Sequence, residues 1–131
     1  MDVNQIAEKA VEFKNAYGFN CCQAVTYALS FETETDIKIL NDIASGFGLG
    51  MGTTEGVCGA LVGAGMIAGI KCEGRATVRQ TREILTSFKA LSGAIYCKDL
   101  KGIETGKVLC SCDDCVKNAV KAYAGVMGLS E

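Results

Sequence analysis

Apolar residues recur every three to four positions over most of the chain, the spacing that places them on one side of an α-helix. The first such segment follows Asn4 and ends at Gly18, because glycine commonly follows the last turn of a helix. The second begins at Asn20, which has capping-box spacing with Gln23, and a third spans 36–44. The side chains predicted to face the core from these three helices are Ile6, Ala10, Phe13, Tyr17, Ala24, Val25, Ala28, Leu29, Ile37, Leu40, Ile43 and Ala44.

The rest of the chain mixes glycine-rich and helical stretches. Alternating glycines in 45–56 predict a loop, because glycine disfavours helix and strand interiors. The segment 57–70 is rich in small residues, so packing rather than local preference would hold it as a helix. The longest helical pattern spans 75–96, an irregular connection is expected over 97–109, and the last helix begins at Ser111. The apolar positions of the longest pattern are Val78, Ile84, Leu85, Phe88, Leu91 and Ile95.

These patterns predict an all-α fold with almost no β-branched alternation. A chain of 131 residues is long enough to bury a core without crosslinks, and it contains no linker or low-complexity segment. We therefore expect one compact domain over residues 1–131, a helical bundle of about five to six helices with a glycine-rich loop.

Charge and hydropathy exclude several classes of partner. The net charge of −2 provides no strong field for nucleic acid or for an anionic membrane. The longest uncharged apolar stretch, 56–70, is shorter than the roughly 20 residues that a bilayer-spanning helix needs. The N-terminal residues have neither the basic nor the apolar region of a signal peptide, so we expect a cytoplasmic protein.

Cysteine is the residue type that points to chemistry. The chain has eight cysteines and no histidine, so it lacks the usual general base and the commonest metal ligand. In the cytoplasm, clustered thiols more often bind metal or perform redox reactions than form structural crosslinks. Cysteine chemistry without histidine therefore favours a redox or metal-binding role.

Five of the cysteines fall where helices are predicted to begin. Cys21 and Cys22 lie in the first turn of the second helix, Cys58 near the start of the glycine-rich helix, and Cys112 and Cys115 in the first turn of the last helix. A helix N-terminus offers unpaired N–H groups and a partial positive charge, which favour the thiolate form. If these three helix starts converge, they create a thiolate-stabilising site.

The sharpest local motif is the C-x-C-x-x-C string at 110–115. Within it, Cys112 and Cys115 have the spacing of a redox dithiol, although the two intervening aspartates oppose thiolate formation. The same string could supply three thiolates to one metal ion or iron–sulfur cluster. Structural zinc sites commonly use a second C-x-x-C, which is absent, so zinc would have to recruit Cys58 or Cys97.

The order and context of the cysteines resemble those of a family of redox-active proteins named for a C…GCAxxG…C…C pattern. The resemblance covers roughly residues 15–125. Residues 20–25 resemble the first element, 58–63 the central motif, 97–100 the third element, and Cys112 with the valine and alanine that follow it the fourth. The family name places a glycine before the central cysteine, whereas here the glycine follows it.

The resemblance implies a small, mostly helical module with a redox role, and it supplies no substrate. The residues that match the four family cysteines are Cys21, Cys58, Cys97 and Cys112. Of these, Cys97 is the one that the argument from helix starts does not select. The cysteines outside the pattern are Cys22, Cys72, Cys110 and Cys115, of which Cys72 is expected to be inert.

Three hypotheses follow. In the first, the protein carries electrons for an unidentified redox protein through an iron–sulfur cluster. Its ligands would be Cys21, Cys58, Cys97 and Cys112, with Cys110, Cys115 or Cys22 as substitutes. In the second, it is a thiol–disulfide oxidoreductase in which Cys112 attacks and Cys115 resolves. In the third, zinc holds the helices together and the surface binds a partner. The small-residue segment 57–70 would also suit a close contact between two copies of the chain, so a homodimer is a further expectation.

Overall fold

The computed structural model describes residues 2–129 and confirms the all-α fold. The elements of this part of the chain are, in order, α1 (Val3–Tyr17), α2 (Cys21–Leu29), the 3₁₀ turn η1 (Ser30–Glu32), α3 (Ile37–Ala44), the π-helical turn η2 (Gly50–Thr54), α4 (Gly59–Lys71), α5 (Thr77–Ser92), α6 (Cys97–Lys101) and α7 (Cys112–Met127). Over residues 2–129 there is no strand, and an isolated antiparallel bridge joins Val57 to Tyr96.

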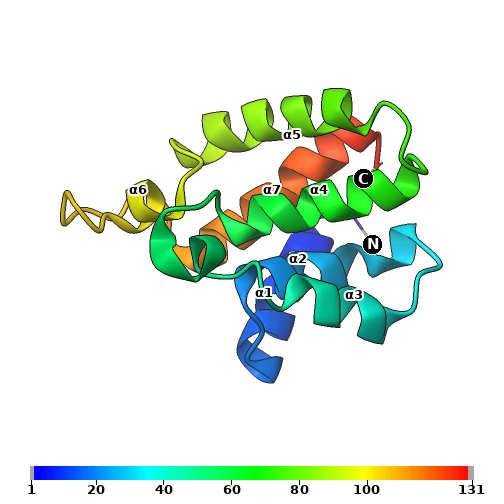
Figure 1. The fold of residues 1–131 in the computed structure, drawn as a ribbon, viewed down its shortest axis with the longest axis horizontal. Coiled ribbons are helices and arrows are strands. Elements are labelled where there is room, and N and C mark those ends of the chain that lie inside the picture. The colour runs from blue at the N-terminus through cyan, green and yellow to red at the C-terminus, as the bar shows by residue number, and fades with distance from the viewer. Residues whose placement is uncertain (1, 130–131) are drawn as a thin grey trace.

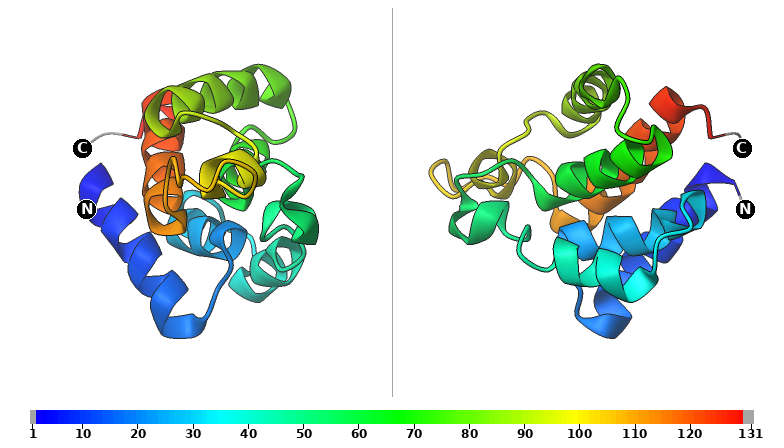
Figure 2. Two further views of the ribbon diagram at one scale, coloured as in Figure 1. Left: turned by 90° about the vertical axis from the view of Figure 1, so that its left-hand side faces the viewer. Right: turned by 45° about the vertical axis from the view of Figure 1, so that its right-hand side comes forward.

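Helices α4 and α7 form the centre of the bundle (Figure 1). Helix α7 packs against α1, α2, α4 and α5, so it contacts both sides of the molecule. Helix α5 covers one side, and α1, α2 and α3 form the other (Figure 2). The short helix α6 and the connection that follows it project from one end of the bundle, close to η2 (Figure 1).

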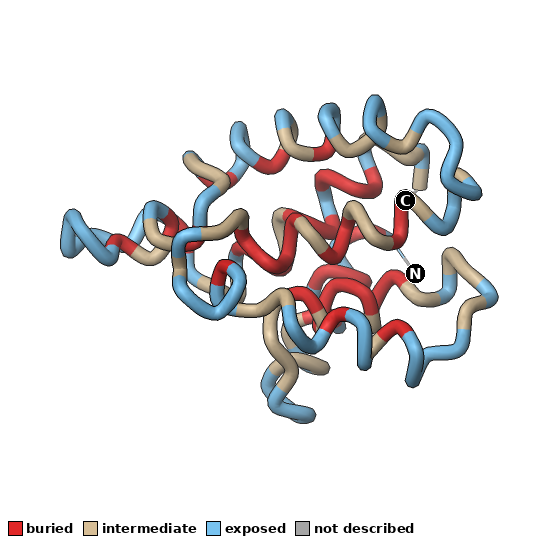
Figure 3. Tube along the Cα trace, in the orientation of Figure 1, coloured by how far each residue is buried: buried red, intermediate tan, exposed pale blue. Residues whose placement is uncertain are grey.

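The core lies between the central helices and the inner faces of α2 and α5 (Figure 3). Its largest fully buried side chains include Tyr123 and Phe88. Glycines let α4 approach α2 closely, because a Cβ atom at Gly63 would lie 2.9 Å from the backbone oxygen of Cys22. Packing therefore holds this low-propensity helix, as the sequence predicts.

Local capping explains where several helices begin and end. The Asn20 side chain accepts a hydrogen bond from the Gln23 N–H at 2.8 Å, and the Gln23 side chain accepts one from the Asn20 N–H at 3.0 Å. This capping box confirms the predicted start of α2. Gly18 ends α1 in the left-handed conformation, as predicted. The cap of α1 is Asp2, however, and not Asn4, because Asp2 forms the capping box with Gln5.

Some side chains predicted to face the core are exposed. Ile37 and Ile43 are 40% and 53% exposed, because α3 packs mainly against α2 and buries only Leu40 and Ala44. Helix α5 ends at Ser92, short of the predicted 96, because Gly93 adopts a left-handed conformation. The other predicted apolar positions that are largely exposed are Tyr17, Val78 and Leu91.

The connection predicted over 97–109 contains a helix. Helix α6 occupies Cys97–Lys101 and raises the number of α-helices to seven in the described residues. A five-residue helix carries too little periodicity to be recognised from its sequence. No helix of residues 2–129 combines the length and hydropathy that crossing a bilayer requires.

Candidate functional site: a cysteine-lined cavity

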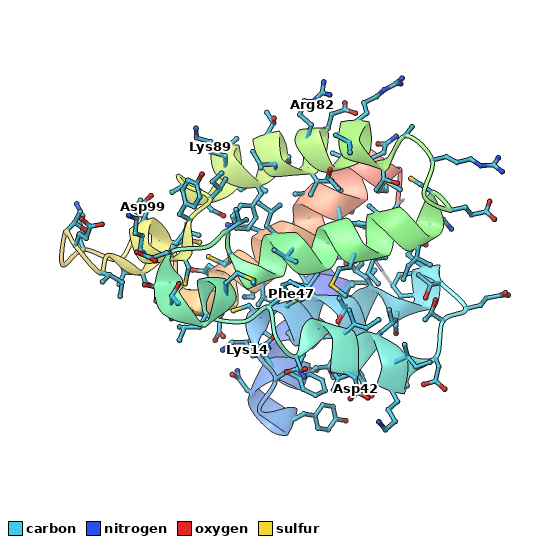
Figure 4. All side chains as sticks on the ribbon, in the orientation of Figure 1. Lys14, Asp42, Phe47, Arg82, Lys89 and Asp99 are labelled. Atoms are coloured by element: carbon cyan, nitrogen blue, oxygen red, sulfur yellow. The ribbon has the colours of Figure 1, made fainter. Side chains whose placement is uncertain are left out.

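Six cysteine residues line one cavity of about 210 Å³ at the end of the bundle from which α6 projects. We call this space the cysteine cavity and define it by its six cysteines, which are Cys21, Cys58, Cys97, Cys110, Cys112 and Cys115. Sulfur atoms are visible where α6, η2 and the start of α7 meet (Figure 4). The four predicted ligands and the predicted dithiol partner Cys115 therefore line one cavity, which Lys14 and Lys101 also line, whereas the substitute ligand Cys22 does not line it.

The start of a helix positions each of the four cysteines that match the family pattern. Cys21 and Cys112 are the first residues of α2 and α7, and Cys58 is the N-cap of α4. The expected convergence of these three helix starts is present in the structure. Cys97 is the first residue of α6, so it also begins a helix, which the sequence did not reveal.

Two backbone hydrogen bonds hold Cys58 beside Cys97. The Cys58 N–H donates to the Ile95 carbonyl at 2.8 Å, and the Cys97 N–H donates to the Gly56 carbonyl at 3.0 Å. These bonds flank the bridge between Val57 and Tyr96. The main chain therefore brings together two cysteines that are far apart in the sequence.

The glycine-rich loop closes tightly over the same region. Gly50 has φ +55°, and a Cβ atom there would lie 2.6 Å from the Cβ atom of Cys97. A Cβ atom at Gly59 would collide with the carbonyl oxygen of Phe47. Glycine at both positions thus allows backbone and side chains to approach closely around the cavity. Leu49, which lines the cavity, has φ +51°, an unfavourable value for leucine.

Cys112 is the thiol whose environment most favours the thiolate. Its sulfur accepts hydrogen bonds from the Cys21 thiol and, at 3.1 Å, from Lys101 Nζ. The Cys21 hydrogen bond and the two interactions with Lys101 outweigh partial burial and lower the pKa of Cys112 to about 5, with a further contribution from the charge of Lys14. The same hydrogen bond, together with burial, raises the pKa of Cys21. Cys21 and Cys112 therefore form a thiol–thiolate pair.

A second pair lies deeper in the cavity. The Cys115 thiol donates a hydrogen bond to the sulfur of Cys58, which lowers the pKa of Cys58 although burial opposes the shift. Backbone N–H groups of Ala60 and Leu61, in the first turn of α4, also favour the Cys58 thiolate. The pKa of Cys115 is raised by its hydrogen bond to Cys58 and by burial. The predicted dithiol partners Cys112 and Cys115 thus share the cavity, while each makes its hydrogen bond to another cysteine.

The aspartates beside Cys112 do not prevent thiolate formation. Asp113 Oδ1 forms an ion pair with Lys14 Nζ at 3.0 Å, which offsets its charge and ties α7 to α1. Burial acts against the charge of Lys14, but the hydrogen bond with Asp113 and the neighbouring charges raise its pKa overall. The local opposition expected from these carboxylates is outweighed by the lysines and by Cys21.

The remaining cysteines have different surroundings. Cys22 is fully buried, and its thiol contacts the Met66 sulfur at 3.6 Å. Burial, assisted by the charge of Cys58, raises the pKa of Cys22 to about 12, as for a core residue. Cys72 is the C-cap of α4, at the end opposite Cys58. Cys110 lines the cavity, and its sulfur accepts a hydrogen bond from the Asn118 side chain at 3.7 Å.

The donor set of the cavity fits a soft metal centre. Its lining contains six thiols and no carboxylate, which favours thiolate-bound zinc, copper(I) or iron–sulfur centres over magnesium or calcium. The two lysines and the helix starts would offset the negative charge of several thiolates. Among residues 2–129, no group of three or more candidate ligands is already arranged around one ion position. The fit therefore rests on the type of donor and on the shared cavity.

The two lysines are the part of the site that reasoning from the sequence missed. Lys101 lies four residues after Cys97, one turn along α6, so recognising that helix would have placed it near the thiols. Lys14 reaches the cavity from α1, and nothing in its local sequence indicates this contact. Its position depends on the packing of α1 against α7.

A known protein family matches most of the chain. The model of a family described as "putative redox-active protein (C_GCAxxG_C_C)" matches residues 19–126. No curated protein and no solved structure matches the chain. The matched range includes all six cysteines of the cavity.

Proposed function

The chain belongs to this family of redox-active proteins, and on that premise we propose that it is an electron carrier whose cysteine cavity holds an iron–sulfur cluster. The ligands would be Cys21, Cys58, Cys97 and Cys112. The observation that carries the proposal is that these four cysteines, each at the start of a helix, line one cavity together with two lysines. The partner would be another redox protein.

Each part of the cavity has a role in this proposal. A bound cluster would supply one-electron storage at a potential set by its surroundings. Lys14 and Lys101 would offset the negative charge of the ligated sulfurs, and N–H groups in the first turn of α4 would donate to the Cys58 sulfur. The apolar side chains of Leu49 and Leu100 would limit the entry of water.

A second candidate is thiol–disulfide exchange, which the contact between Cys21 and Cys112 favours. The Cys112 thiolate would attack a substrate disulfide and release one thiolate. Cys21, after losing its proton, would then attack the Cys112 sulfur, release the second thiolate and leave a Cys21–Cys112 disulfide. The hydrogen bond between these two sulfurs supports Cys21, rather than Cys115, as the resolving thiol.

The test is an absorption spectrum with iron, sulfide and zinc measurements on protein purified without oxygen. We expect a broad sulfide-to-iron absorption band with iron and acid-labile sulfide in a simple ratio. Cys112→Ser should remove the iron, whereas Cys72→Ser should retain it, because Cys72 is at the far end of α4.

Other outcomes of these measurements would contradict the cluster proposal. A colourless protein that takes up no iron on reconstitution and forms a reversible Cys21–Cys112 disulfide would favour the exchange reaction. Stoichiometric zinc, with a melting temperature that falls on chelation, would favour the structural zinc module.

A further inference from the structure

The glycine-rich loop over residues 45–56 forms one wall of the cysteine cavity. It includes η2 and lies beside α6 at the end of the bundle (Figure 1). Leu49 and Gly50 line the cavity, while Leu49 and Met51 keep 51% and 60% of their surface exposed. Within this loop, which the structure describes throughout, only Gly50 is buried. Hydrogen bonds and close contacts rather than core packing therefore hold the loop in place.

The conformation of the loop is strained. Leu49, Met51 and Thr54 have φ values of +51°, +63° and +66°. Residues with a Cβ atom disfavour this left-handed conformation, and they keep it only where the surrounding contacts impose it. The shape of the loop therefore depends on specific contacts, and its residues would relax if those contacts were released.

Asn20 supplies the contacts that tie the loop to α2. Its side-chain amide group donates hydrogen bonds to the Ser45 carbonyl at 3.0 Å and to the Ala44 carbonyl at 3.5 Å, where α3 ends and the loop begins. Gly48 lies against the same side chain, since a Cβ atom there would be 2.5 Å from the Asn20 Cβ atom. One side chain thus joins the loop to the helix start that carries Cys21.

We propose that the glycine-rich loop is a lid on the cysteine cavity and that the Asn20 side-chain amide is the latch that keeps this lid closed. With the lid closed, Cys58 and Cys97 are only 5% and 6% exposed, and Gly50 packs directly against Cys97. Opening would uncover these thiols to an incoming soft metal ion or iron–sulfur cluster. The use of the lid in loading rests on the proposed function, whereas the opening itself requires no metal.

The other end of the loop is fixed by main-chain bonds. The Cys97 N–H donates to the Gly56 carbonyl at 3.0 Å, and Val57 forms the bridge to Tyr96. Neither contact involves Asn20, so the loss of its amide leaves their donors and acceptors in place. We therefore expect opening to begin at the Ser45 end and to pivot about residues 56–57.

Three hydrogen bonds inside the loop indicate whether the lid is closed. They run from the N–H groups of Gly52, Thr54 and Gly56 to carbonyl oxygens four to six residues earlier, at 2.9–3.0 Å. These bonds depend on the left-handed conformations of the loop, so they break when the latch is released and the residues relax. The amide protons then exchange with solvent.

The test is hydrogen–deuterium exchange of the full chain, purified without oxygen and analysed by mass spectrometry of its peptides. Asn20→Ser removes the amide donor but keeps a hydroxyl that can cap α2. We expect exchange over residues 45–56 to accelerate about tenfold, while peptides from α4 and α7 keep their protection. Asp2→Ser, the matched control, changes a cap whose side chain bonds within α1, and it should leave exchange of the loop unchanged.

Labelling of Cys97 provides a second measurement, which a general loss of stability would not reproduce. In chelator-treated, metal-free protein, Asn20→Ser should speed the reaction of Cys97 with N-ethylmaleimide by a similar factor, because the loop covers that thiol. Cys22, which has no exposed surface, should remain unlabelled in both proteins.

Three results with Asn20→Ser would overturn the inference: unchanged exchange over residues 45–56, an equal acceleration in α4 and α7, or faster exchange of the loop with unchanged labelling of Cys97. If this variant fails to fold, the wild-type chain decides. A lid requires exchange over residues 45–56 that is insensitive to low denaturant, and the denaturant dependence of α4 and α7 in the loop would contradict it.

Iron is measured on the same samples, so the lid and the cluster are tested separately. Iron-free protein in which the loop opens by itself supports the lid while contradicting the cluster. Iron-loaded protein in which the loop exchanges only together with α4 and α7 does the reverse.

Discussion

Cys58 and Cys72 lie at the two ends of one helix, and the ends differ in every respect that matters for chemistry. Cys58 caps the amino end of α4, where N–H groups and the Cys115 thiol point at its sulfur. Cys72 caps the carboxyl end, where the last turn presents carbonyl oxygens. The first end borders a cavity with five further cysteines, and the second does not.

The carboxyl end of α4 is built for stability. Tyr123 is fully buried there, and its hydroxyl donates to Glu32 Oε1 at 2.9 Å. Glu32 Oε2 also lies 3.7 Å from Lys71 Nζ. Burial and the hydrogen bond to Glu32 raise the pKa of Tyr123, which keeps its proton. The buried Tyr123 hydroxyl, with its hydrogen bond to Glu32 formed, therefore stabilises the fold and is not accessible for reaction.

The comparison shows that the environment of a cysteine at a helix terminus depends on whether it lies at the amino or the carboxyl end. The two cysteines belong to the same helix, yet only the one at the amino end receives hydrogen bonds from backbone N–H groups and from another thiol. The number of cysteines in the sequence does not distinguish Cys58 from Cys72, whereas their positions at opposite ends of α4 do.

The largest difference between the two ends is expected when their cysteines are replaced. Cys58→Ser should reduce bound iron by more than about tenfold, because it removes a proposed ligand. Cys72→Ser should leave the iron content unchanged. Iron and sulfide analysis of both variants, purified without oxygen, checks the expectation. Equal iron in the two variants would contradict the placement of the site at the amino end.

Replacing one glycine near each end of α4 with alanine should also affect the free energy of unfolding differently. Gly59→Ala should reduce the free energy of unfolding by about 1–3 kcal/mol, because the added Cβ atom meets the carbonyl oxygen of Phe47. Gly69→Ala should raise it by about 0.5–1 kcal/mol, since its nearest neighbour there is the Thr77 methyl carbon at 3.7 Å. Denaturant unfolding measures both, and a similar loss in the two variants would show that the close approach is not confined to the thiol end.

At the opposite end, Tyr123→Phe removes the hydrogen bond to Glu32. We expect a loss of about 1–2 kcal/mol in the free energy of unfolding, because a partly buried carboxylate loses one donor. The rate of Cys112 alkylation should not change. A change in that rate would mean that the two ends are coupled through α7.

The reactivity of Cys112 should depend on one lysine of α6. Alkylation by iodoacetamide should rise with pH around a midpoint near 5, the value to which Cys21 and Lys101 lower the pKa of Cys112. Lys101→Met should move that midpoint upward and slow alkylation severalfold at pH 6. Because the folded-state pKa lies below the ordinary value of 9.0, the stabilisation from this thiolate is complete above that value and is lost as the pH falls through about 5.

Lys98→Met is the control for this effect. Lys98 lies on the same helix, but its ammonium group pairs with Glu104 at 3.2 Å. The Lys98→Met substitution should leave the midpoint of Cys112 alkylation unchanged. A midpoint that moves equally in both variants would indicate a general charge effect rather than the contact at 3.1 Å between Lys101 and Cys112. Mass spectrometry of the Cys112 peptide resolves the rates.

The sequence predicts most of the fold because local signals mark the helices. The capping residue Asn20 and the terminal glycine Gly18 have side-chain or backbone preferences that act over a few residues. The prediction that Ile37 and Ile43 face the core is wrong, because periodicity identifies an apolar helix face but does not show whether another helix covers that face. Helix α6 was missed because five residues are too few to show a period.

The candidate site follows the same division. Cys21, Cys58 and Cys112 could be selected from the sequence because helix starts are local features. The pairing of Cys21 with Cys112, and of Cys58 with Cys115, could not, because it depends on how α2, α4 and α7 pack. The position of Lys14 was equally hidden, since it depends on the contact of α1 with α7.

The bridge between Val57 and Tyr96 makes the site a candidate for redesign. Main-chain atoms alone form the two hydrogen bonds that set Cys58 beside Cys97. Neither bond uses a side-chain atom, so replacing a thiol with histidine or aspartate would keep the donors and acceptors that hold the segments together. The bundle therefore offers a scaffold in which donor atoms can be exchanged singly, and with them the preference for one metal over another.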